Sequence, residues 1–127
     1  MQSISSFRMK RLLVLAALAL VLLPGCAYET PVQRYSESAS KFRKPPQMMS
    51  HSYPDKDVYR IFQQGATGFV PLASIREDLK LQAEKFCERQ GKGMVVLGAN
   101  YSKPPYILGN FPRMELIFAA VERPSKD

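Results

Sequence analysis

The side chains best suited to nucleophilic or metal chemistry in this 127-residue chain are those of two cysteines and one histidine. Cys87 lies on the apolar stripe of a predicted helix, whereas His51 lies in a distant segment rich in Pro and Ser. A Cys–His nucleophile pair needs the imidazole beside the thiol, and zinc-type sites need clustered ligands. We therefore expect Cys87 to be a small core residue rather than a redox or interchain thiol. His51 is expected to be neither a metal ligand nor a pH switch.

Other catalytic patterns are also missing from the sequence. The acidic residues between positions 77 and 88 alternate with Lys and Arg at the spacing of a solvated helix face. The segment Gly65-Ala66-Thr67-Gly68 lacks the Lys-Ser/Thr ending of a phosphate-binding loop. We therefore expect no enzymatic activity and no cofactor.

Cys26 lies at the end of a different kind of pattern. Basic residues at positions 8–11 precede twelve apolar residues at 12–23, and the run ends in Leu23-Pro24-Gly25-Cys26. This layout is typical of a secretory signal peptide, and its last four residues resemble the lipobox of bacterial lipoproteins. The resemblance implies that residues 1–25 are removed, and that Cys26 becomes a lipidated N-terminus with a diacylglyceryl group on its sulfur. It also implies a further acyl chain on the amino group.

The apolar run is too short to be a membrane span. Twelve residues make a helix of roughly 18 Å, against a hydrocarbon core of roughly 30 Å, which disfavours an uncleaved anchor with Cys26 as an ordinary thiol. Two or more acyl chains hold a protein stably on a bilayer. Because Ala27 rather than Asp follows the cysteine, the resemblance implies the outer membrane, with the protein facing the periplasm.

Residues 26–56 are predicted to be the lipidated cysteine followed by a flexible tether. They contain four prolines and show no sustained apolar period, although the part around Met48, Met49 and Tyr53 could pack on the domain. Without residues 1–25 the chain has fifteen Lys and Arg against eleven Asp and Glu, a net charge of +4. This charge is dispersed and no nucleic-acid motif is present, so nucleic-acid binding is not expected.

Residues 57–123 are predicted to form a small α+β domain of the β-α-β-β type, followed by a tail at 124–127. β-Branched and aromatic residues predict strands at 58–62, 94–101 and 114–122. A capping box at Ser74–Glu77 and an apolar stripe at steps of three and four predict a helix over about 74–90, ended by Gly91 and Gly93. The expected architecture is a three-stranded sheet with this helix on one face.

The strands are apolar on both sides, so the second sheet face also needs a cover. In the last strand Met114, Leu116, Phe118 and Ala120 point one way, and the intervening positions 117, 119 and 121 are apolar too. Three covers are open: the 42–56 segment, a second copy of the chain, or another protein.

Two loops carry apolar tips. The connections at 65–73 and 102–113 are expected to share one end of the domain, opposite the point where the tether joins it. Their apolar residues either form an interaction site or fold inward to complete a small core. The candidate interaction residues are Phe69, Leu72, Tyr106, Ile107, Leu108 and Phe111.

The sequence therefore favours a membrane-anchored, non-catalytic protein-binding or structural module of the cell envelope, with an envelope protein or a second copy as partner. An inhibitor or immunity protein directed against an enzyme that acts in the periplasm is the alternative. A cell-wall or lipid hydrolase is the least supported.

Overall fold

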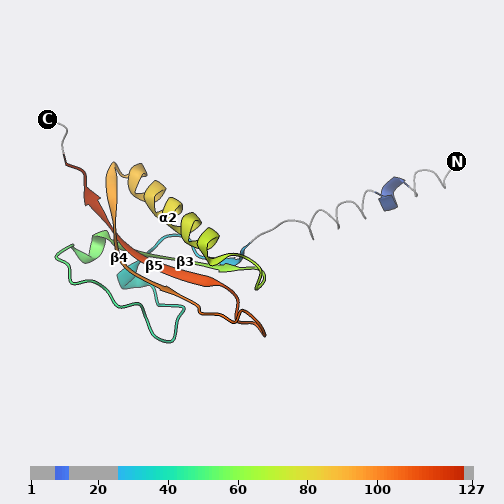
Figure 1. Ribbon diagram of the computed structural model, residues 1–127. Coiled ribbons are helices and arrows are strands. Elements are labelled where there is room, and N and C mark those ends of the chain that lie inside the picture. Colours follow the sequence, from blue (N-terminus) through green and yellow to red (C-terminus); the bar gives the residue numbers. More distant parts are fainter. Residues whose placement is uncertain (1–7, 12–25, 125–127) are drawn as a thin grey trace.

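The computed structural model describes residues 8–11 and 26–124. Residues 26–124 form an antiparallel sheet with one long helix on one of its faces (Figure 1). The predicted signal segment over 12–25 and the last residues of the tail lie outside the described residues. No helix within the described ranges is long and apolar enough to cross a membrane. In chain order the elements are β1 (Cys26–Glu29), β2 (Gln33–Arg34), η1 (Tyr35–Glu37), η2 (Asp55–Asp57), β3 (Val58–Gly65), α2 (Leu72–Arg89), β4 (Lys92–Tyr101) and β5 (Arg113–Glu122).

The sheet has the strand order β1-β3-β5-β4, and β2 pairs with β3 on the same side as β1. Both β3 and β4 are antiparallel to β5, which lies between them. β3 and β4 therefore run in the same direction, and α2 makes the crossover between them. The predicted α+β class, with one helix on one face, is confirmed. The sheet has five strands rather than three because residues 26–34 run back along β3.

Helix α2 begins two residues before the predicted capping box. Pro71 is the N-cap residue and no side chain caps the helix, whereas the backbone N–H of Ser74 donates to the Pro71 carbonyl at 3.1 Å. The capping-box prediction was therefore wrong, because Pro71 with φ −65° already sets the direction of the first turn. The helix ends as predicted, since Gly91 has φ +70° and its N–H donates to Glu88 O.

The helix-side core confirms the predicted stripe. Ile75, Leu79, Ala83 and Cys87 of α2 are all buried, and they pack against the side of β5 that carries Leu116 and Phe118. The ring of Phe86 lies edge-on to Tyr59, with their centroids 4.7 Å apart. This core could be predicted from the sequence because the apolar residues of α2 follow the 3.6-residue period of a helix and those of β5 follow the two-residue period of a strand.

The second sheet face is covered by the segment that was expected to be a tether. Val58, Leu97, Ile117 and Ala119 are buried there under side chains of residues 35–53. The backbone N–H of Met49 donates to Leu97 O at 2.9 Å. Gly98 allows this close approach, because a Cβ at that position would lie 2.8 Å from the Gln47 carbonyl oxygen. Of the three covers considered, the chain itself is the one present, over residues 35–53 rather than 42–56.

Candidate functional site

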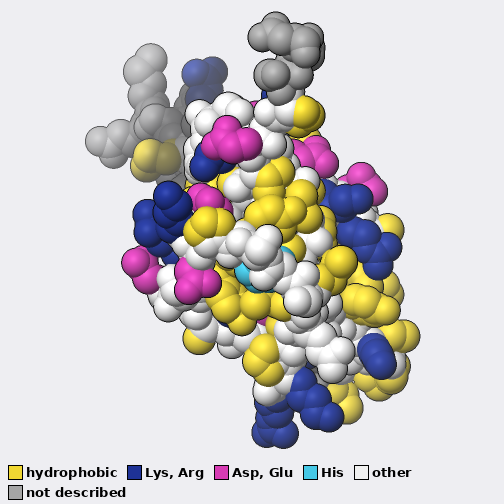
Figure 2. Space-filling model, turned by 90° about the vertical axis from the view of Figure 1, so that its left-hand side faces the viewer, with side chains coloured by type: hydrophobic (Ala, Val, Ile, Leu, Met, Phe, Trp, Pro, Cys, Tyr) yellow, Lys and Arg dark blue, Asp and Glu magenta, His cyan; other side chains and the backbone are white. Residues whose placement is uncertain are grey.

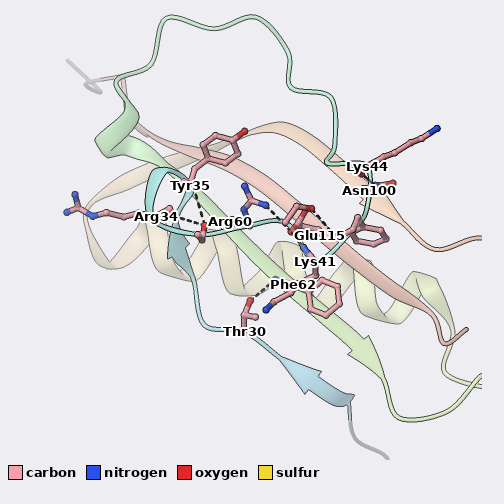
Figure 3. A network of polar contacts seen from close by, with 12 residues as sticks. Thr30, Arg34, Tyr35, Lys41, Lys44, Arg60, Phe62, Asn100 and Glu115 are labelled. Carbon is pink, nitrogen blue, oxygen red and sulfur yellow. Dashed lines mark hydrogen bonds and ion pairs between the residues drawn. The ribbon is translucent and has the colours of Figure 1, made fainter. Parts of the chain in front are cut away.

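A buried polar network fastens the covering segment to the sheet. The Glu115 side chain on β5 is fully buried, and its carboxylate accepts hydrogen bonds from the Ser40 hydroxyl at 2.6 Å and the Lys41 backbone N–H at 3.2 Å. Arg60 on β3 approaches the same carboxylate at 3.3 Å (Figure 3). The Arg60 guanidinium also lies over the Tyr35 ring, 4.8 Å from its centroid. Since the carboxylate is enclosed and already paired, its role is structural.

The sequence analysis missed this network, although a signal for it was present. Glu115 has the same strand parity as Ile117 and Ala119, which places it on the second sheet face. Arg60 has the same parity as Val58 and pairs across the strands with Ile117. A charge at each of two neighbouring inward-facing positions predicts a buried ion pair.

Cys26 is the first residue of β1, which makes it part of the sheet. β1 runs antiparallel to β3, and Cys26 pairs with Gly65, the last residue of β3. Beyond β1, Thr30 N–H donates to Phe62 O, and Phe62 N–H donates to the Thr30 hydroxyl, both at 3.0 Å. No flexible spacer therefore separates Cys26 from the domain. The residues that were predicted to form a tether form β1, β2 and the segment that covers the second sheet face, because they make hydrogen bonds to β3 and β4.

The two apolar loops share one end of the domain, as predicted. β3 and β4 are parallel to each other, so the loops at 66–71 and 102–112 both follow the C-terminal ends of strands at the same end of the sheet. Gly65 N–H donates to Pro112 O at 2.8 Å. A Cβ on Gly68 would collide with the Tyr106 carbonyl oxygen, so the loops touch directly. Figure 1 shows this end on the right, where β1 also begins.

The six candidate interaction residues divide into two groups. Phe69, Ile107 and Leu108 project into solvent, with exposed fractions of 96%, 61% and 100%; we call these three side chains the loop-end surface. Leu72, Tyr106 and Phe111 are only partly exposed. Of these, Leu72 packs against the helix-side core, and the Tyr106 hydroxyl donates to Ser102 O at 2.9 Å. Both readings of the loops therefore apply, each to different residues.

Hydrogen bonds within the second loop fix the position of its tip. The Asn110 amide donates to the carbonyls of Lys103 and Pro105 at 2.9 and 2.7 Å. Asn110 in turn accepts from the Arg113 guanidinium at 3.0 Å. The tip is thus held outward by the loop's own bonds, with Ile107 and Leu108 at its apex.

Leu108 adopts a backbone conformation that its side chain disfavours. Its φ is +53°, and Gly109 follows with φ +85°. A left-handed conformation costs about 1–2 kcal/mol per residue for most L-amino acids, and Asn tolerates it better than Leu. Fold stability alone does not explain a fully exposed leucine at this position.

We expect Leu108→Asn to raise the midpoint of thermal unfolding by a few degrees, because it relieves the backbone without removing a buried contact. The matched control is Ile107→Asn in the same loop, where φ is not positive and no gain is expected. Differential scanning calorimetry of the two variants checks this. Equal midpoints for both variants would contradict the strain argument.

Cys87 and His51, the other two side chains considered for chemistry, are both held in contacts within the fold. Cys87 is 1% exposed, and burial raises the pKa of its thiol, so the sulfur is held in its neutral, unreactive form. His51 Nδ1 accepts from the Tyr53 N–H at 3.2 Å, and the two rings stack. Within residues 8–11 and 26–124, no three His, Cys, Asp or Glu side chains lie close enough together to hold a metal ion.

The chain was compared with protein families, characterised proteins and solved structures, and none of them matches it.

Proposed function

We propose that this chain is a lipoprotein of the bacterial cell envelope, anchored through acylated Cys26, that acts as a non-catalytic protein-binding or structural module. The observation that carries the proposal is the joint position of Cys26 and the fold. The residue that completes the lipobox-like motif is also the first residue of β1, directly beside the end of β3. Processing before Cys26 would leave the described domain intact, because every strand of the sheet begins at or after that residue.

An anchor at Cys26 orients the domain. The end that carries the α2–β4 turn and η2 then lies away from the membrane, available to other envelope proteins. Figure 2 shows this end, where hydrophobic side chains are interspersed with Lys, Arg, Asp and Glu. A shallow groove is lined by residues 49–53 of the covering segment and by Val95, Val96 and Leu97 of β4, and the lining residue Met49 is 67% exposed. The core of a protein interface is depleted of charged residues and enriched in Met and Tyr, and Met49 and Tyr53 both line this groove.

The proposal is tested by reversible crosslinking in membranes, followed by recovery of the tagged protein. We expect a discrete envelope partner, or a crosslinked second copy, in the membrane fraction of the wild type. Met49→Glu should weaken recovery of that partner, because it places a charge in the lining of the groove. Leu81→Glu is the matched control, since Leu81 is 48% exposed on α2 and lies outside this groove.

Two results would contradict the proposal. One is a wild-type protein found outside the membrane fraction. The other is an anchored protein that yields neither a partner nor a self-crosslinked product at any crosslinker length.

A further inference from the structure

We propose that the loop-end surface, formed by Phe69, Ile107 and Leu108, inserts into the same bilayer that holds the lipid on Cys26. This inference rests on the proposed anchoring of the chain, and it names the occupant of the surface. The domain would then sit directly on the membrane with its loops at the lipid surface.

Cys26 lies at the same end of the domain as the two loops. Cys26 pairs with Gly65, and the 66–71 loop begins at the next residue. The 102–112 loop is in contact with it, through the bond from Gly65 N–H to Pro112 O and the packing of Gly68 on Tyr106. A lipid attached at Cys26 therefore brings the bilayer to the end of the domain that carries both loops. With no spacer, the domain cannot move far from that position.

The two loops are apolar and almost free of charged residues. Three large apolar side chains are exposed within two touching loops, which is more than isolated surface hydrophobics explain. Across the stretches 66–71 and 102–112 the only charged residue is Lys103, and there is no carboxylate. A bilayer interface favours apolar and aromatic tips with an accompanying cation, because basic side chains attract anionic lipids. Tyr106 is partly exposed next to Ile107, and tyrosine is a residue type that suits the same boundary.

Hydrogen bonds hold the tip of the second loop in an outward position. Asn110 and Arg113 hold the second loop in one shape, and the left-handed backbone at Leu108 turns an apolar side chain fully outward. A loop recruited to fill the core would fold these side chains inward. Strained residues that persist at exposed tips often serve binding. A protein partner could use an apolar tip as well, but it would have to fit between the domain and the lipid attached at Cys26.

Tryptophan substitution tests the inference directly, because the chain contains no Trp of its own. The protein would be purified from detergent extracts of the cell envelope as Phe69→Trp and as Leu108→Trp, and reconstituted in phosphatidylethanolamine–phosphatidylglycerol vesicles. Half of the vesicles would carry brominated acyl chains, which quench only a fluorophore that reaches them. The control is Leu81→Trp, whose site lies on α2 about 14 Å beyond the start of the helix.

We expect the emission of both loop variants to shift to shorter wavelength and to be quenched several-fold more than that of Leu81→Trp. Loop emission that matches the control, in protein that floats with the vesicles, would overturn the insertion while leaving the anchor in place. A blue shift without quenching would also overturn it, and would indicate that a protein such as a second copy covers the surface. Protein that does not float with the vesicles would refute the anchor itself, and the insertion with it.

Discussion

Replacing Glu115 with alanine is expected to lower the free energy of unfolding by about 3–5 kcal/mol, the usual cost of removing one partner from a buried ion pair. The substitution leaves the Arg60 guanidinium buried without its carboxylate, and the Arg60 side chain is only 7% exposed. It also removes the acceptor for the Ser40 hydroxyl and the Lys41 N–H. Small domains are typically stable by only about 5–15 kcal/mol, so this loss removes from about a fifth to all of the stability.

Urea unfolding followed by circular dichroism measures this loss, and two further variants show its cause. Glu122→Ala on the same strand removes an exposed carboxylate, and we expect it to change stability by less than about 0.5 kcal/mol. The double variant Arg60→Met/Glu115→Leu should recover much of the loss, because it leaves no unpaired buried charge. If Glu115→Ala is as stable as Glu122→Ala, the network does not fasten the covering segment.

Replacing Cys26 with serine is expected to abolish lipidation and to leave the chain as an uncleaved precursor that keeps residues 1–25. A hydroxyl is not the thiol that receives the diacylglyceryl group, so neither the lipid nor the cleavage that depends on it would follow. Because the precursor keeps the apolar run at 12–23, the size of the chain and its acyl content report the loss, rather than its location.

Immunoblotting for the size of the chain and metabolic labelling with a fatty acid check this prediction, with Cys87→Ala as the matched control. That control removes the other thiol of the chain, which is buried in the helix-side core. It should have the mature size and take up the label. A Cys26→Ser variant that takes up fatty acid, or that has the mature size, would contradict anchoring through Cys26.

The regular parts of the fold could be predicted from the sequence because their periods are unbroken. β5 alternates cleanly, with Met114, Leu116 and Phe118 toward the helix and Ile117 and Ala119 toward the opposite face. The stripe of α2 ends at Gly91, as a left-handed glycine commonly ends a helix. The shared end of the two loops followed from the connectivity alone.

The path of residues 26–56 could not be predicted in the same way. β1 has four residues and β2 has two, too few to show an alternating pattern. The side chains that cover the second face, among them Tyr35, Met48 and Tyr53, follow no period because their backbone is irregular. Their prolines and serines indicated a tether, whereas partners distant in sequence, such as Glu115 and Leu97, hold this chain in place.

This difference changes the expected orientation of the domain. With a tether of about thirty residues, the loops would have been directed away from the membrane. With Cys26 paired to Gly65, they lie beside Cys26, the residue proposed to carry the lipid. Sequence pattern identified the residues Phe69, Ile107 and Leu108 as candidates, and only the pairing of β1 with β3 indicates which surface they face.

The intact mass of the protein purified from the membrane fraction tests the central claim most directly. The account predicts a chain that begins at Cys26 and carries the added mass of a diacylglyceryl group and a further acyl chain, with fragment ions that place both on that residue. An unmodified chain that retains residues 1–25, or one cleaved elsewhere with a free Cys26 thiol, would contradict the anchor and the orientation derived from it.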